Sequence, residues 1–96
     1  MRSGTVVVCD FPGVVNTKKR PAIVVSSEKY HQERPDAILA IITGQIDKSN
    51  SSTDYVLSDW QEANLKKPSA ARMFIFTLPQ YELTEIGELS EKDGLR

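Results

Sequence analysis

The sequence is short of the residues from which metal centres and disulfides are built. Its 96 residues include one cysteine, Cys9, and one histidine, His31. A single cysteine excludes an internal disulfide and a cysteine-cluster metal site, and a single histidine excludes sites that need two imidazoles from one chain. Motifs with the spacing of metal ligands, Gly-rich phosphate loops or serine-hydrolase elbows are also missing. We therefore expect a function that uses no metal and no cofactor.

Long apolar runs are missing too. No run approaches the roughly 20 residues that a membrane-spanning helix needs. The apolar run near the start, VVVC, is too short for the core of a signal peptide. These absences predict a protein without a membrane segment, in the reducing cytoplasm.

What is present is ordinary globular composition, with 40% hydrophobic and 26% charged residues. This length and composition predict a single domain over residues 1–96. Residues 1–72 hold ten Lys/Arg and eight Asp/Glu, a charge of +2, and residues 73–96 hold two and five, a charge of −3. A mildly basic body could meet a polyanion, although plain solvated surface gives the same distribution.

Short β-branched and apolar runs, separated by turn residues, predict a mainly β fold of five to six strands arranged as a small barrel or twisted sheet. Residues 27–36 are expected to form a polar loop. Ser58 and Asp59 are expected to cap a short helix that ends at Asn64. Ser90 to Asp93 has the form of a capping box, which predicts one final turn of helix. The predicted strands are residues 5–11, 21–26, 37–43, 54–57 and 69–78.

Three consecutive cations, Lys18, Lys19 and Arg20, lie between the first two predicted strands. Such a run can form a phosphate-binding lip, or it can simply keep a loop soluble. Arg20 stands out because Pro21 follows it and restricts its backbone to extended conformations. A guanidinium held in this way at the start of a strand can present its donors to a phosphate.

Two further positions could carry chemistry. Thr43, Gly44 and Gln45 end the most apolar strand, where a hydroxyl meets the surface, although Thr43 could equally satisfy a backbone group. Arg72 interrupts an apolar strand and must face solvent, a cleft or an acid, because unpaired burial of a charge is costly.

The remaining distinctive residues favour structural interpretations. His31 lies in a polar segment without a recognisable orienting partner, so a solvated loop histidine is expected. Cys9 lies on an apolar strand and is expected to be buried and inert. Trp60 is expected to cover the core.

Taken together, the segments GTVVVCDFPG, KKRPAIVVS, AIITGQI, DYVLSDWQEANLKKPSAARMFIFTL and IGELSEKD resemble the PemK/MazF toxin family, the mRNA interferases of toxin–antitoxin modules. The segments follow the family order over nearly the whole chain. The resemblance implies an SH3-like barrel with a C-terminal helix, shortened here, and a homodimer. It also implies metal-independent cleavage of single-stranded RNA and neutralisation by a cognate antitoxin protein.

The same resemblance implies functional positions. The arginine of the RP motif and the threonine that closes the third strand are catalytic in the family, and they correspond to Arg20 and Thr43. Lys18, Lys19, Gln45 and Arg72 are then expected to bind RNA. One branch of the family uses an arginine followed two residues later by an aspartate. Arg72 matches that arginine but Phe74 replaces the acid, so that branch's mechanism is not carried over.

The alternative is a non-catalytic binding protein on the same barrel. A related branch poisons gyrase through a C-terminal helix that ends in an exposed tryptophan. This chain ends DGLR and its only tryptophan is Trp60, which disfavours that activity. An inactive, shortened toxin that still binds its antitoxin is the other non-catalytic interpretation.

The apolar residues of the last third of the chain predict association. A barrel of this size cannot easily cover all of them without the full family helix. The sequence therefore predicts an obligate homodimer, with the C-terminal segment as a candidate for exchange between subunits. The residues concerned are Ile75, Phe76, Leu78, Leu83, Ile86 and Leu89.

Overall fold

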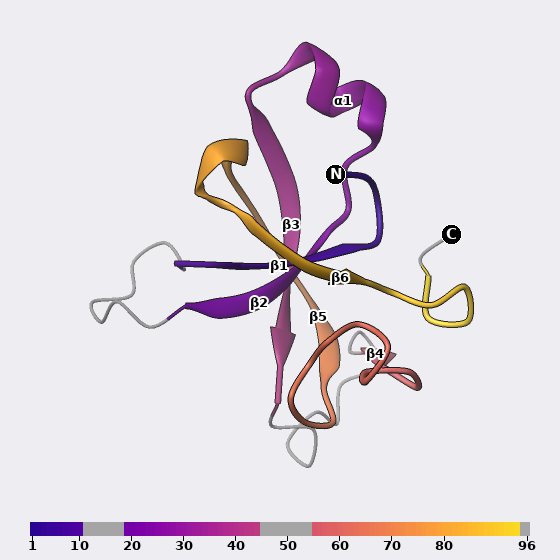
Figure 1. Ribbon diagram of the computed structural model, residues 1–96. Coiled ribbons are helices and arrows are strands. Elements are labelled where there is room, and N and C mark those ends of the chain that lie inside the picture. Colours follow the sequence, from indigo (N-terminus) through magenta and orange to yellow (C-terminus); the bar gives the residue numbers. More distant parts are fainter. Residues whose placement is uncertain (11–18, 45–54, 95–96) are drawn as a thin grey trace.

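The computed structural model describes residues 1–10, 19–44 and 55–94. These residues form one antiparallel six-stranded sheet in the order β4-β5-β3-β2-β1-β6 (Figure 1). The architecture is thus mainly β, as the sequence predicted. The elements are β1 (Thr5–Cys9), β2 (Arg20–Val24), α1 (Glu28–Glu33), β3 (Asp36–Thr43), β4 (Tyr55–Val56), β5 (Ala70–Pro79), the 3₁₀ turn η2 (Gln80–Glu82) and β6 (Thr84–Glu88).

The central strand β3 is the apolar run that the sequence marked as most buried. It pairs with β2 on one side and with β5 on the other. The pairing with β5 is regular except at one irregularity, where Ala40 lies opposite Ile75 and Ile41 lies opposite Arg72. Two β5 residues therefore stand where β3 supplies none, and such an irregularity increases the local bend of a strand.

The sheet curls, so that strands far apart in its order contribute to the same core cluster. One core cluster combines Val6, Ile23 and Ala71 with Ile86 of β6, although three strands separate β5 from β6 in the sheet order. The second cluster lies on the other face and contains Val7, Cys9, Ala22, Val24, Ala37 and Leu39. Burying each large apolar side chain contributes about 1.5–3 kcal/mol, which favours the curled arrangement over a flat sheet.

The segment after β4 closes the first cluster, but it does so with turns rather than with the predicted helix. The Leu65 N–H donates to the Trp60 carbonyl, and Asn64 adopts the left-handed conformation with φ 63°. The left-handed conformation of Asn64 at the end of this segment was predicted. The prediction of a helix before Asn64 was wrong. Gly87 permits the close packing, because a Cβ there would lie 2.6 Å from the Ala63 carbonyl oxygen.

The predicted C-terminal turn of helix is also wrong within the described residues, where residues 91–93 form a plain turn. One half of the capping box does form, since the Asp93 N–H donates to Ser90 Oγ at 3.2 Å. The buried Asp93 carboxylate instead accepts hydrogen bonds from the Ser58 and Asp59 N–H groups, at 2.9 and 2.7 Å. Long-range hydrogen bonds therefore replaced the local helical ones.

The one α-helix among the described residues lies in the segment that we expected to be a polar loop. Ser27 caps α1, and its Oγ accepts from the Tyr30 N–H. The helix has six residues and no buried side chain, so it carries no apolar periodicity that sequence analysis could detect.

The last third of the chain covers more of its apolar surface than we predicted. Phe76, Leu78 and Leu83 pack against the second cluster, and Ile86 and Leu89 pack against the first. Of the six residues on which the obligate dimer was argued, only Ile75 is exposed. The chain thus covers this surface itself, which corrects the premise of that argument. No helix in the described residues has the length and apolar character needed to cross a membrane.

Candidate functional site

Three strand ends meet at one end of the sheet and position the predicted catalytic residues. Ala22 of β2 lies opposite Ile41 of β3; Arg20 lies two residues before Ala22 and Thr43 two residues after Ile41, so both lie at the same end of this antiparallel pair. On the other side of β3, Thr43 lies opposite Ala70, the first residue of β5. Residues that face each other in antiparallel strands project to the same side of the sheet. Thr43 is therefore flanked by the strand that carries Arg20 and by the strand that carries Arg72.

A groove of about 690 Å³ opens at this end of the sheet. Its lining comes mainly from β2, from the end of β3 and from the segment that leads into β5. Of the residues that the structure describes, the polar ones that line it are Lys19, Arg20, Thr43, Asn64, Lys66, Lys67, Ser69 and Arg72.

The groove brings together four of the six residues that the sequence singled out. Arg20, Thr43, Lys19 and Arg72 all line it. The other two, Lys18 and Gln45, lie outside the described residues.

Sequence analysis missed Lys66 and Lys67, which line the same groove. A signal for them existed. Lys66-Lys67-Pro68 repeats the pattern of Lys19-Arg20-Pro21, in which two cations precede a proline; Pro21 is the second residue of β2, and Pro68 lies two residues before β5.

The groove is electropositive. Its lining includes five cationic side chains and, within the described residues, no carboxylate. One of these cations lies near a carboxylate outside the lining, since Asp10 Oδ2 is 3.7 Å from Lys19 Nζ. Clustered cations repel one another, so such a surface is favoured only when it meets an anion. Arginine and lysine side chains around a hydroxyl can bind a phosphate and stabilise charge that develops on its oxygens.

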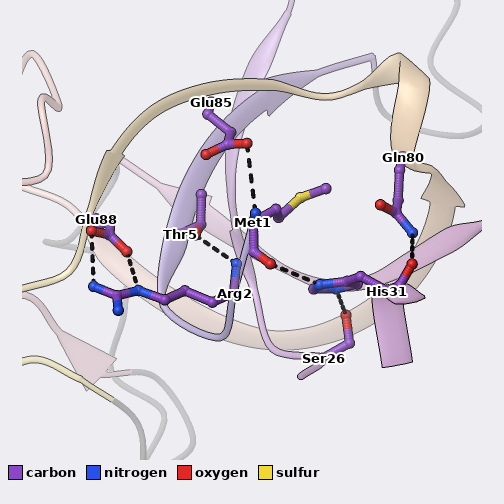
Figure 2. Close-up of polar contacts among 8 residues, drawn as sticks. All are labelled: Met1, Arg2, Thr5, Ser26, His31, Gln80, Glu85 and Glu88. Carbon is purple, nitrogen blue, oxygen red and sulfur yellow. Dashed lines mark hydrogen bonds and ion pairs between the residues drawn. The ribbon is translucent and has the colours of Figure 1, made fainter. Parts of the chain in front are cut away.

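The single histidine lies away from the groove, at the opposite end of β3 (Figures 1 and 2). His31 Nε2 is 2.6 Å from Ser26 Oγ, and His31 Nδ1 is 3.0 Å from the Met1 carbonyl oxygen. Ser26 Oγ also accepts from the Ile38 N–H at 3.0 Å. His31 is thus half-buried and held by partners, which corrects the expectation of a solvated histidine, and its bonds serve to join the chain start to β3.

Cys9 and Trp60 behave as structural residues, as predicted. Cys9 is fully buried in the second cluster, and burial raises the pKa of its thiol to about 11. A thiol with this pKa is protonated at neutral pH and is a poor nucleophile. Trp60 packs against the first cluster.

Comparison with known proteins identifies the family of the chain. No curated protein matches the chain. The family model described as the PemK-like, MazF-like toxin of type II toxin–antitoxin systems matches residues 2–94, almost the entire sequence. The chain therefore belongs to the PemK/MazF-like toxin family of type II toxin–antitoxin systems.

Proposed function

We propose that this protein is an endoribonuclease that cleaves single-stranded RNA, as toxins of this family generally do, without a metal ion. One observation supports the proposal: Thr43 lines the same groove as five cationic residues. Its described lining offers no carboxylate, the ligand on which Mg²⁺ sites usually depend. The donor set suits a phosphate better than a cation.

The proposed reaction uses the 2′-hydroxyl of the RNA itself. Its oxygen attacks the adjacent phosphorus, the bond from phosphorus to the 5′-oxygen breaks, and a 2′,3′-cyclic phosphate remains. The 2′-hydroxyl loses a proton and the departing 5′-oxygen gains one. DNA lacks the attacking group and is spared.

Arg20 and Thr43 have separate tasks in this reaction. Arg20 neutralises the charge that gathers on the phosphoryl oxygens and favours departure of the 5′-oxygen. Thr43 donates a hydrogen bond to a non-bridging oxygen. Lys18, Lys19 and Arg72 bind neighbouring phosphates without reading bases, and Gln45 also contacts the RNA.

The proposal includes two protein partners and a cytoplasmic setting. Family membership supports a cognate antitoxin that neutralises the toxin. A homodimer is supported by the family and by Phe74 and Ile75, two exposed apolar side chains on β5.

The test is incubation of the purified protein with a long single-stranded RNA in excess EDTA, followed by mapping of the new ends. The matched control is a single-stranded DNA of the same sequence, which lacks the 2′-hydroxyl groups. Cleavage of the RNA alone, with cyclic phosphate termini, is the expected result. Binding of both polymers with cleavage of neither would instead favour a non-catalytic binding protein.

A further inference from the structure

We infer that Lys67, whose side chain packs against Gly44, binds a second phosphate of the RNA in the groove and so positions the RNA for Arg20 and Thr43. The inference rests on the proposed function and extends it to a groove-lining residue to which the family resemblance gave no role. It would hold a phosphate next to the one that is cleaved. Lys67 is therefore a positioning residue, which acts through the placement of the RNA.

The Lys67 side chain packs against the backbone of Gly44. A Cβ added to Gly44 would lie 2.9 Å from Lys67 Nζ and 3.1 Å from Lys67 Cδ, with Lys67 Cε closer still. The lysine stem therefore occupies the space that any other residue at position 44 would fill. Because Gly44 directly follows Thr43, this contact holds the ammonium beside the strand end that carries the proposed catalytic hydroxyl.

The backbone around Lys67 is also held. Pro68 restricts Lys67 to extended conformations. Ser69 Oγ donates to the Lys67 carbonyl oxygen at 2.8 Å, and the Ser69 carbonyl accepts from the Leu57 N–H at 2.9 Å. Ser69 is buried, so these hydrogen bonds hold the segment in one conformation. A lysine on a fixed backbone loses less conformational entropy when it binds a phosphate.

The two cation–proline segments face each other across β3. Arg20-Pro21 begins β2 on one side, and Lys67-Pro68 leads into β5 on the other. A lysine that only keeps the surface soluble would need neither the packing against Gly44 nor the fixed backbone. Among the described residues Lys67 has no ion pair with a carboxylate, so its charge is available to a ligand.

The test measures binding to an RNA oligonucleotide whose single 2′-deoxy sugar blocks cleavage, together with kcat and KM on the cleavable RNA. Lys67→Ala is expected to weaken binding by about tenfold and to lower the salt slope of binding by about 0.7. KM should rise more than kcat falls. Lys67→Arg should restore most of the binding. Lys29→Ala, which removes a lysine on α1 outside the groove, is the matched control and should change nothing.

Gly44→Ala gives a second and independent test. The new methyl group displaces the Lys67 side chain while leaving its charge in the protein, so this variant should bind RNA nearly as weakly as Lys67→Ala. In the Lys67→Ala background the same substitution meets no side chain and should have little further effect. If the losses of RNA binding caused by Gly44→Ala and Lys67→Ala add up in the double variant, the contact between Gly44 and Lys67 does not position the lysine.

The outcomes separate this inference from the proposed function. If the wild type cleaves RNA and Lys67→Ala binds with unchanged affinity and salt slope, the role inferred for Lys67 is wrong and the nuclease stands. If the wild type does not cleave but Lys67→Ala lowers binding as expected, the groove is an RNA-binding site and the nuclease is wrong. If the wild type does not bind RNA, both are wrong.

Discussion

The two ends of β3 use polar residues in opposite ways. At the start of the strand, polar side chains have hydrogen-bond partners: Gln80 Nε2 lies within hydrogen-bond distance of three carbonyl oxygens, and Tyr30 Oη donates to Asp36 at 2.6 Å. At the far end, five cationic side chains line one groove with no carboxylate among its described residues. Figure 2 shows the first end, where dashed lines join nearly every labelled side chain to a neighbour.

The difference separates stability from function. Hydrogen bonds between satisfied groups stabilise the fold, and their removal leaves unpaired donors or acceptors. Clustered like charges do the opposite and are tolerated where a ligand uses them. The only histidine lies at the satisfied end. Its hydrogen bonds to Ser26 and Met1 therefore mark it as a structural residue, although histidine is the commonest acid–base residue of enzymes.

The largest effect should follow from a change at the groove end. Arg20→Ala is expected to lower the rate of RNA cleavage by on the order of 10²–10³, because one stabilising donor at the phosphate is lost. Arg20 is exposed, so the free energy of unfolding should change by less than about 0.5 kcal/mol. Cleavage assays and urea unfolding on the same preparation check both statements. Cleavage at the wild-type rate would remove Arg20 from the site.

A buried carboxylate outside both ends extends the comparison. Asp93→Ala should lower the free energy of unfolding by about 3 kcal/mol, since it leaves the Ser58 and Asp59 N–H groups without their acceptor. Urea unfolding at pH 7 measures the loss. Glu82→Ala removes an exposed carboxylate and is the control. Equal stability of the two variants would contradict the structural importance of Asp93.

The pH dependence of stability tests the same carboxylate. Burial alone would raise the pKa of Asp93, but the Ser58 and Asp59 N–H groups and the Tyr55 hydroxyl outweigh it and lower the pKa below its usual 3.8. A lowered pKa in the folded state means that the stabilisation is present above about pH 4 and is lost as the pH falls through the folded value. Wild type should therefore lose stability in this acid range, and Asp93→Ala should lose less.

At the satisfied end, Ser26→Ala should affect stability but not chemistry. It removes the acceptor of the Ile38 N–H and the partner of His31 Nε2, which is expected to cost about 1–3 kcal/mol of unfolding free energy. For a domain of this size each kcal/mol lowers the melting temperature by roughly 4–8 °C. Calorimetry measures the shift. Loss of cleavage at a temperature where the variant is folded would break the comparison.

The smallest effect concerns the electrostatic contacts of the groove. Lys19→Ala and Arg72→Ala should each lower the salt slope of binding to single-stranded RNA by about 0.7, one phosphate contact apiece. The loss should be similar for RNAs of different sequence, because phosphate contacts carry no sequence information. Fluorescence titrations at several salt concentrations measure the slope. A loss confined to one RNA sequence would show that these residues read bases.

Most of the sheet could be predicted, because β-branched runs such as those of β1, β2 and β3 report burial directly. The errors lie where distant contacts decided local structure. The Ser90–Asp93 pattern predicts a capping box, but Asp93 bonds to Ser58 and Asp59, more than thirty positions earlier. No local pattern could reveal that choice. α1 was missed because it is short and has no buried face.

The candidate site divides in the same way. Arg20 and Thr43 belong to motifs next to strands, so their positions could be read from the sequence. Lys67 could not, because its position depends on how the segment before β5 folds back over Gly44. The repeated cation–proline pattern was the available signal, and only the register of β3 with its two neighbours gives that pattern a meaning.

The most direct test of the account compares Thr43→Val with His31→Asn, one variant from each end of β3, by cleavage rate and by unfolding free energy. We predict a crossed result. Thr43→Val should stay folded but cleave RNA about 10²-fold more slowly, because a donor to the phosphate is lost. His31→Asn should be less stable yet cleave RNA normally when folded. Normal cleavage by Thr43→Val, or a folded His31→Asn that no longer cleaves, would contradict the assignment of chemistry to the groove end.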